Sequence, residues 1–248
     1  MLWPTDIKKI RRNAVVGLVI AAVLYNIPKG YRAIRSPELL ETKNIDGIEL
    51  NIVRSRGKNM AFKVFDDLLL DRRPTCYTEI AGEQIKCQVD MSAVEGTAEE
   101  LLEYWRDCEA QSGSFKQELV YYFLKYKGCK TRDEARKCLV EELKNATIAH
   151  EVYGHGKNPE YIQLSSDFSK LIKLREQSER VASIATLKRH PHMALILLEN
   201  ARRGETLIYA NTANGIYDDL RKYAPFWDIP KKSPEELADL AKKLQYKK

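Results

Sequence analysis

The chain of 248 residues carries 41 Lys and Arg residues against 35 Asp and Glu residues, a formal net charge of +6 at pH 7. Seven of the basic residues and one acidic residue lie within residues 1–35, so residues 36–248 carry no net charge. A charge-balanced domain offers no basic face for nucleic acid, and we predict that nucleic acid is not a partner. The length suits one domain with a sizeable hydrophobic core.

Residues 1–35 have the features of a membrane anchor or a signal peptide. A charge-free segment, residues 13–28, follows four basic residues and precedes three more. Its apolar part, residues 14–27, spans about 21 Å as a helix, and snorkelling basic side chains extend it toward the ~30 Å hydrocarbon core. Because no small-residue cleavage site follows, we predict an uncleaved signal anchor: a single-pass helix in the lipid bilayer, with the main domain on the extracytoplasmic side. A buried or amphipathic helix of a soluble protein is the alternative.

Residues 46–91 are predicted to form a small antiparallel β region. Residues 47–53 alternate between apolar and polar side chains, and residues 61–65 form a short apolar run. Residues 76–80 and 84–89 flank a three-residue turn that contains Gly82, the pattern of a hairpin.

From residue 98 to residue 245 the hydrophobic pattern is helical. The predicted helices cover residues 98–110, 115–126, 132–153, 166–188, 193–202, 214–222 and 234–245. The predicted fold class is therefore α+β: an N-terminal transmembrane or signal-anchor helix, a small antiparallel β region, and then a mainly helical part. The predicted domains are the basic arm, residues 1–35, and a single domain, residues 36–248.

The five cysteines contain no C-x-x-C pair, which argues against a structural zinc ribbon. Cys76 and Cys87 fall almost opposite each other across the predicted hairpin, and Cys129 and Cys138 bracket the start of a predicted helix. Each pair is a candidate disulfide, and reduced, buried thiols are the alternative.

Two of the four histidines, His150 and His155, flank Glu151 near the end of the predicted helix at residues 132–153. A zinc hydrolase needs imidazole ligands on one side of the metal and a carboxylate beside the attacking water. In a regular α-helix, residues five apart point about 140° away from each other. A π-helical turn would bring both histidines to one face, and we expect Gly154 to permit it.

The sequence from His150 to Gly156, H-E-x-x-G-H-G, resembles the zinc motif of the dipeptidyl peptidase III family. These zinc exopeptidases are similar at their metal site to the thermolysin-like peptidases. The resemblance implies Zn²⁺ bound by His150 and His155, Glu151 as general base, and a third ligand from a glutamate on a downstream helix. It also implies a zincin-like domain, in which a small sheet precedes the helix that carries the motif. In place of the family's second motif, Glu-Glu-Cys-Arg-Ala-Glu, this chain has Arg-Glu-Gln-Ser-Glu-Arg at residues 175–180.

The third metal ligand is predicted from helix geometry to be Glu176, which lies 21 residues after His155. A new helix that begins at Ser165 or Ser166 places Glu176 about 15 Å along its axis, within reach of a crossing helix. Glu179, one turn further, ranks second, and Glu160, in a predicted loop, ranks third.

His190 and His192 flank Pro191 at a predicted helix break and are candidates to stabilise an oxyanion during catalysis. Tyr153 and Tyr161 are further candidates for this role. The alternative for the two histidines is that they are partly solvated residues at the start of the next helix.

Together these features predict a membrane-anchored zinc metallopeptidase that acts on a peptide or protein substrate. A second hypothesis is a non-catalytic, membrane-anchored scaffold or subunit, in which the histidines are structural and Gly154 ends the helix in a left-handed conformation. A third is a domain that binds zinc without proteolytic activity.

Overall fold

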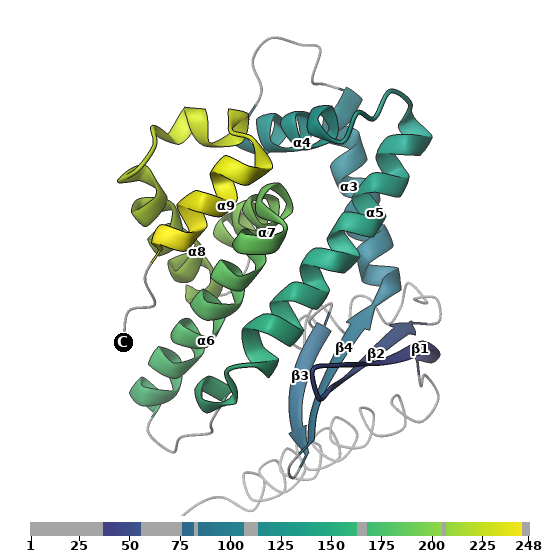
Figure 1. The fold of residues 1–248 in the computed structure, drawn as a ribbon, viewed down its shortest axis with the longest axis vertical. Coiled ribbons are helices and arrows are strands. Elements are labelled where there is room, and N and C mark those ends of the chain that lie inside the picture. The colour runs from purple at the N-terminus through teal and green to yellow at the C-terminus, as the bar shows by residue number, and fades with distance from the viewer. Residues whose placement is uncertain are drawn as a thin grey trace, which may run out of the picture.

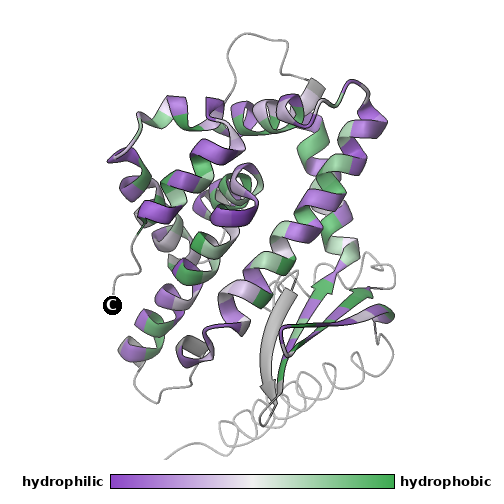
Figure 2. Ribbon diagram, viewed as in Figure 1, coloured by the Kyte–Doolittle hydropathy of each residue, from purple (hydrophilic) through white to green (hydrophobic). Residues whose placement is uncertain are grey.

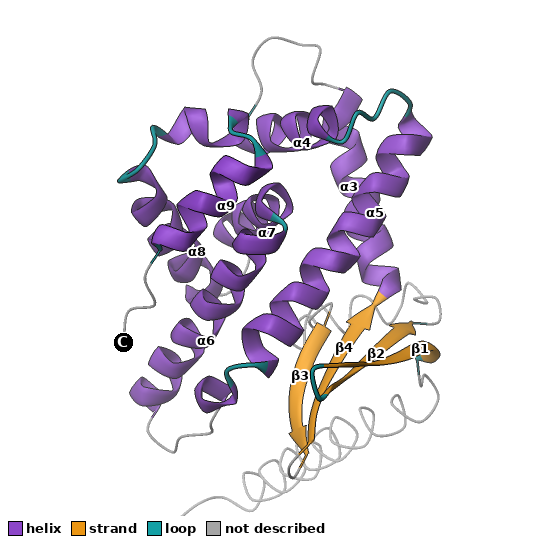
Figure 3. Cartoon of the chain, viewed as in Figure 1, coloured by secondary structure: helices purple, strands orange, loops and turns teal. Residues whose placement is uncertain are grey.

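The computed structural model describes residues 37–55, 76–81, 84–106, 114–162, 168–204 and 207–244. It is mostly helical, with a small four-stranded sheet at one end of the helical part (Figures 1 and 3). The strands are β1 (Glu38–Ile45), β2 (Ile48–Arg54), β3 (Cys76–Ala81) and β4 (Gln84–Asp90). The α-helices are α3 (Met91–Arg106), α4 (Phe115–Tyr126), α5 (Arg132–Ile148), α6 (Phe168–Arg189), α7 (Pro191–Gly204), α8 (Leu207–Arg221) and α9 (Pro234–Lys243). The remaining helical segments are the π-helix η2 (Ala149–Gly156) and the 3₁₀-helices η3 (Pro159–Ile162) and η4 (Phe226–Lys231).

The sheet is mixed, with the strand order β1-β2-β4-β3. β1 and β2 form an antiparallel hairpin, and its turn residues Asp46 and Gly47 have φ values of 52° and 86°. Two positive φ values are typical of the type I′ turn that suits a two-residue hairpin. β3 and β4 are also antiparallel, but the central strands β2 and β4 run parallel. These central strands supply the sheet's part of the core, including the fully buried side chains of Leu50 and Val89.

The predicted fold class, α+β with an antiparallel β region, is wrong because the molecule is mostly helical and its sheet is mixed. Both strands of the predicted hairpin form, but β4 then pairs in parallel with β2, from Glu49 opposite Lys86 to Val53 opposite Asp90. Parallel pairing joins strands that are distant in the sequence, and no local turn signal announces it. The predicted strand at residues 61–65 lies outside the described residues.

The predicted membrane anchor, residues 1–35, also lies outside the described residues. Across the part of the chain that the structure describes, none of the helices combines the length and the hydropathy that crossing a membrane requires. Our prediction of a single-pass membrane protein with an extracytoplasmic domain rested on the composition of one apolar segment. The structure therefore does not support a single-pass membrane location. The transmembrane helix in the predicted fold class is not supported either.

The helix α5 continues without a break into η2, and together they run antiparallel to α6. Glu142 of α5 contacts His190, just after α6, whereas His155 of η2 contacts Ser178, near the middle of α6. η2 packs against α6 and also contacts β2, β3 and β4. In Figure 1, α5 crosses in front of α3, and its lower end leads into η2 beside α6. The motif at the end of α5 is therefore held between a helix and the sheet.

Apolar side chains from both the sheet and the helices meet in one buried cluster. The cluster includes Leu102 of α3, Leu143 of α5, Ile184 of α6 and Leu195 of α7, each at most 2 % exposed. Figure 2 shows hydrophobic residues interspersed with hydrophilic ones along the helices, the pattern of elements with one buried face. This shared core fixes α5 and α6 relative to each other.

Two glycines of η2 allow it to pack unusually close to its neighbours. A Cβ atom placed on Gly154 would lie 2.3 Å from Cα of Ala182 in α6. A Cβ atom on Gly156 would lie 2.7 Å from Cδ1 of Ile48 in β2. The first contact is with backbone, which cannot rotate away, so Gly154 is required for the approach of η2 to α6.

We expect Gly154→Ala to lower the free energy of unfolding by about 1–3 kcal/mol, because the added methyl group overpacks the contact with Ala182. Gly96→Ala is the matched control, since a Cβ atom on Gly96 in α3 meets nothing within 4 Å. The control should stabilise the protein by about 0.5–1 kcal/mol, because alanine favours helix. Urea denaturation measures both values, and similar changes in the two variants would contradict this account of Gly154.

Candidate metal centre

The histidine motif lies in the π-helix η2, as the five-residue spacing predicts. The wider π-helical turn places Nε2 of His150 3.2 Å from Nε2 of His155. Gly154 is not in a left-handed conformation: among the described glycines, positive φ values occur at Gly47 and Gly128. The alternative in which Gly154 stops the helix is therefore wrong. Gly154 is needed because a side chain would clash with α6, and not because the backbone adopts a left-handed conformation.

The chain that leaves η2 is tied down by polar contacts. Asn158 Nδ2 donates a hydrogen bond to the Gly154 carbonyl at 2.6 Å, which satisfies a backbone acceptor at the end of the π-helix. Lys157, the C-cap residue, forms an ion pair of 3.0 Å with Asp46 in the β1–β2 turn. These contacts hold the carboxyl end of the motif against the sheet.

Glu179 of α6 completes a cluster with the two histidines. Its Oε2 atom lies 3.3 Å from Nε2 of His150, and its Oε1 atom lies 3.4 Å from Nε2 of His155. One ligand atom from each of the three residues lies within 4.8 Å of the other two. His150, His155 and Glu179 can therefore hold a metal ion between η2 and α6.

The carboxylate of Glu179 is kept in its charged form. Burial by itself would raise the pKa of Glu179, but hydrogen bonds from His150 and His155 outweigh burial and hold this pKa well below its usual range. An ionised carboxylate is the form that binds a metal ion. The carboxylate of Glu179 is thus in the form that can act as a ligand at neutral pH.

Ser178, which precedes Glu179 on α6, orients the ring of His155. Its Oγ atom lies 2.7 Å from Nδ1 of His155, and Ser178 is only 7 % exposed. When Nδ1–H donates to this hydroxyl, the lone pair of Nε2 faces Glu179 and His150, as a metal ligand requires. Sequence analysis did not identify Ser178, because a serine in the middle of a helix carries no local signal of such a role.

Glu176 and Glu160, the first- and third-ranked ligand candidates, lie elsewhere. Glu176 Oε1 accepts a hydrogen bond of 3.2 Å from Asn211 Nδ2 of α8. Residues three apart on a helix differ by about 60° in direction. Glu176 therefore points toward α8, whereas Glu179 points toward η2. Glu160 is exposed in η3. The structure brings Glu179 to the histidines.

The two histidines around Pro191 are not at the cluster. His190 Nδ1 lies 2.8 Å from Glu142 Oε1, and His190 follows Glu179 by about 16 Å along α6. His192 is 3 % exposed. Burial lowers the pKa of His192 to about 4, although backbone hydrogen bonds at Pro230 and Lys232 oppose the shift. His192 is accordingly a neutral core residue, and the structure assigns neither histidine to an oxyanion site.

Of the two tyrosine candidates, Tyr153 packs on Arg189, whose guanidinium carbon lies 4.0 Å from the ring centroid. The side chain of Tyr161 lies outside the described part of the structure. Glu151, the predicted general base, is 5 % exposed on η2, directly after His150.

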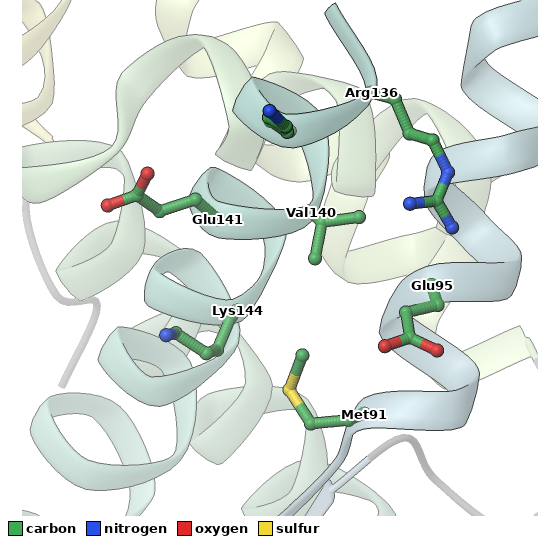
Figure 4. Close-up of a pocket in the computed structure, with 7 residues that line it drawn as sticks. Met91, Glu95, Arg136, Val140, Glu141 and Lys144 are labelled. Atoms are coloured by element: carbon green, nitrogen blue, oxygen red, sulfur yellow. The ribbon is translucent and has the colours of Figure 1, made fainter. Parts of the chain in front are cut away.

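A surface hollow of about 310 Å³ lies between α3 and α5, away from the metal cluster (Figure 4). Its lining residues are Met91, Glu95, Arg136, Lys137, Val140, Glu141 and Lys144. This lining combines both signs of charge and includes none of the three cluster residues.

Comparison with protein-family models, with curated proteins and with solved structures finds no match for this chain. The functional assignment therefore depends on the chemistry of the cluster itself.

We expect Ser178→Ala to weaken the binding of a divalent transition metal by about 10- to 100-fold, because the ring of His155 loses the partner that fixes its tautomer. Thr186→Val is the control, since the Thr186 hydroxyl is also buried on α6 but donates to the Ala182 carbonyl. Titration with Co²⁺, followed by visible absorption, measures both affinities. Equal affinities in the two variants would show that Ser178 does not orient the ligand.

Proposed function

We propose that this chain is a zinc-dependent hydrolase that cleaves peptide bonds. In this proposal His150, His155 and Glu179 bind zinc, and Glu151 is the general base. The observation that carries the proposal is the convergence of the three side chains: the Nε2 atoms of His150 and His155 lie 3.2 Å apart, the two carboxylate oxygens of Glu179 lie 3.3 and 3.4 Å from them, and one ligand atom from each residue lies within 4.8 Å of the other two.

The 3.2 Å separation of the two imidazole nitrogens suits a tetrahedral zinc site. Zinc binds histidine nitrogen and carboxylate oxygen at about 2.0–2.2 Å, so two ligands of a tetrahedron lie about 3.3–3.5 Å apart. The His₂Glu donor set is the one that catalytic zinc sites of peptidases use. Nitrogen and oxygen donors without sulfur also suit other divalent transition metals, which the metal analysis below distinguishes.

The number of ligands favours a catalytic site over a structural one. Structural zinc sites usually have four protein ligands, whereas catalytic sites have three and leave a position for water or substrate. Among the described residues, three side chains converge here. The side chain of His150 is 24 % exposed, compared with 11 % for His155 and 14 % for Glu179, so solvent reaches the cluster beside His150.

The residues around the site support hydrolysis. Zinc bound here supplies a Lewis acid that polarises a carbonyl group and makes water more acidic. Glu151 accepts the proton of the attacking water and transfers it to the departing amine, as a general base and then a general acid. The buried position of Glu151 limits competing contact with bulk solvent. The resemblance of residues 150–156 to the dipeptidyl peptidase III motif supports a peptide as the substrate.

A second candidate function is a zinc-binding domain without hydrolytic activity. The observation that favours it is the burial of Glu151, which is 5 % exposed and so has little contact with a substrate in this conformation. Metal binding is common to both candidates, and turnover separates them.

We expect the full-length protein to bind zinc stoichiometrically and Glu179→Gln to lose it, because the amide removes the charged ligand. Glu176→Gln is a matched control, since Glu176 lies on the same helix and bonds Asn211 instead of the histidines. Elemental analysis after purification without chelators measures zinc in each protein, and circular dichroism checks folding. Zinc that is lost from Glu176→Gln and retained by Glu179→Gln would overturn this ligand set.

We expect Glu151→Gln to retain zinc but to lose hydrolysis by about 10²- to 10⁴-fold, the usual contribution of a general base. His190→Ala is the control, because His190 lies far along α6 from the cluster, and its activity should stay near that of the parent. Incubation with a peptide library and mass spectrometry of the products measures turnover. Unchanged turnover in Glu151→Gln would exclude this base, and zinc binding without any cleavage by the parent would favour the inactive domain.

A further inference from the structure

A pair of cysteines lies at the corner between α4 and α5. The Sγ atoms of Cys129 and Cys138 are 3.0 Å apart, and both side chains are partly exposed. The two cysteines are not linked by a disulfide. A covalent S–S bond is about 2.05 Å long, so a displacement of about 1 Å would join the two sulfur atoms.

The position of Cys129 is fixed by the way α4 ends. Gly128 has a φ value of 69°, and its N–H donates to the Lys125 carbonyl. The N–H of Cys129 donates to the Leu124 carbonyl. These two hydrogen bonds form a Schellman motif, which sets the direction of the chain after the helix.

The position of Cys138 is fixed by the way α5 begins. Thr131 is the N-cap residue, and it exchanges hydrogen bonds with Glu134 in a capping box. Cys138 lies on the second turn of the helix that this cap starts. The backbone on both sides of the thiol pair is thus ordered before any bond forms, which favours reaction within the pair over reaction with a second molecule.

We propose that Cys129 and Cys138 form a thiol–disulfide exchange site that reacts with small-molecule disulfides of the glutathione class. The thiolate of one cysteine attacks the disulfide and forms a mixed disulfide, which releases one glutathione thiolate. The second cysteine, as its thiolate, attacks the protein sulfur of this mixed disulfide and releases the second glutathione. The two protein thiols are oxidised by two electrons, the glutathione disulfide is reduced to two thiols, and the two protons pass to the products.

The bond would fasten the end of α4 to the helix that carries the metal motif. Lys127, next to Gly128, forms an ion pair of 2.9 Å with Glu142, which lies one turn after Cys138 on α5. Glu142 also contacts His190 at 2.8 Å. Oxidation adds a covalent link to a corner that is already held by charge, so it restricts the unfolding of α4 away from α5.

The acidity of Cys129 sets the rate at which this thiol exchanges. Burial, the hydrogen bond that the Cys129 thiol donates to Cys138 and the charge of Glu134 raise the pKa of Cys129 to about 12, although Lys127 opposes the shift. Because the thiolate is the nucleophile, Cys129 is a slow attacker at neutral pH, and its reaction accelerates as the pH rises toward this pKa.

The test uses the full-length protein, equilibrated with reduced and oxidised glutathione, quenched with an alkylating reagent and digested with trypsin. The expected product is a disulfide between peptides 128–130 and 138–144, found by mass spectrometry and lost on addition of a reductant. The oxidised protein should melt about 5–10 °C above the reduced protein.

Cys129→Ser and Cys138→Ser are the matched controls, and each should carry glutathione on its remaining cysteine and show no rise in melting temperature. The same exchange in guanidinium-unfolded protein should give much less of the linked peptide. Glutathione adducts on both cysteines of the folded parent, without the linked peptide, would overturn the proposal. So would an equal yield of linked peptide from the unfolded chain.

Discussion

The contact between Gly154 of η2 and Ala182 of α6 is the constraint on which the metal cluster depends. Two of the three ligands lie on η2 and the third on α6, so the distances of 3.3 and 3.4 Å from Glu179 to the histidines depend on the approach of the two backbones. Only a residue without a Cβ atom permits this, since that atom would lie 2.3 Å from Cα of Ala182. Packing within the shared core then holds α6 at this distance, because well-packed interiors do not deform continuously.

Local patterns in the sequence predicted most of the helices but not the arrangement of the sheet. The helix at residues 115–126 matches α4, and Ser233 caps α9 as the pattern of Ser followed by Pro predicts. α3 begins at Met91, whereas the sequence pattern predicts a start at residue 98. The pattern misses the first turns because they lack strong apolar periodicity. The parallel pairing of β2 with β4 connects residues 37 positions apart and is decided by the core, which a local pattern cannot reveal.

Prediction of the candidate site succeeded where chemistry and spacing were local. The two histidines and the π-helical turn lie within one short segment, and their geometry follows from the number of residues per turn. The role of Glu151 as general base stays a prediction. The third ligand depends on the rotation of α6 about its axis, and the sequence does not specify that rotation. A difference of one turn therefore separates Glu176, which bonds Asn211, from Glu179, which contacts both histidines. The roles of His190 and His192 depend on Glu142 and on the core, which only the folded structure shows.

His150 and His155 are five residues apart, one more than the four-residue spacing that places two residues on one face of an α-helix, and this extra residue explains why the metal ligands and the close packing occur together. In an unmodified α-helix, residue 154 would share a face with His150 and would occupy the position of the second ligand. The π-helical turn rotates Gly154 onto Ala182 and brings His155 into the ligand position. One inserted residue thus supplies both the second imidazole and the space that lets the third ligand reach it.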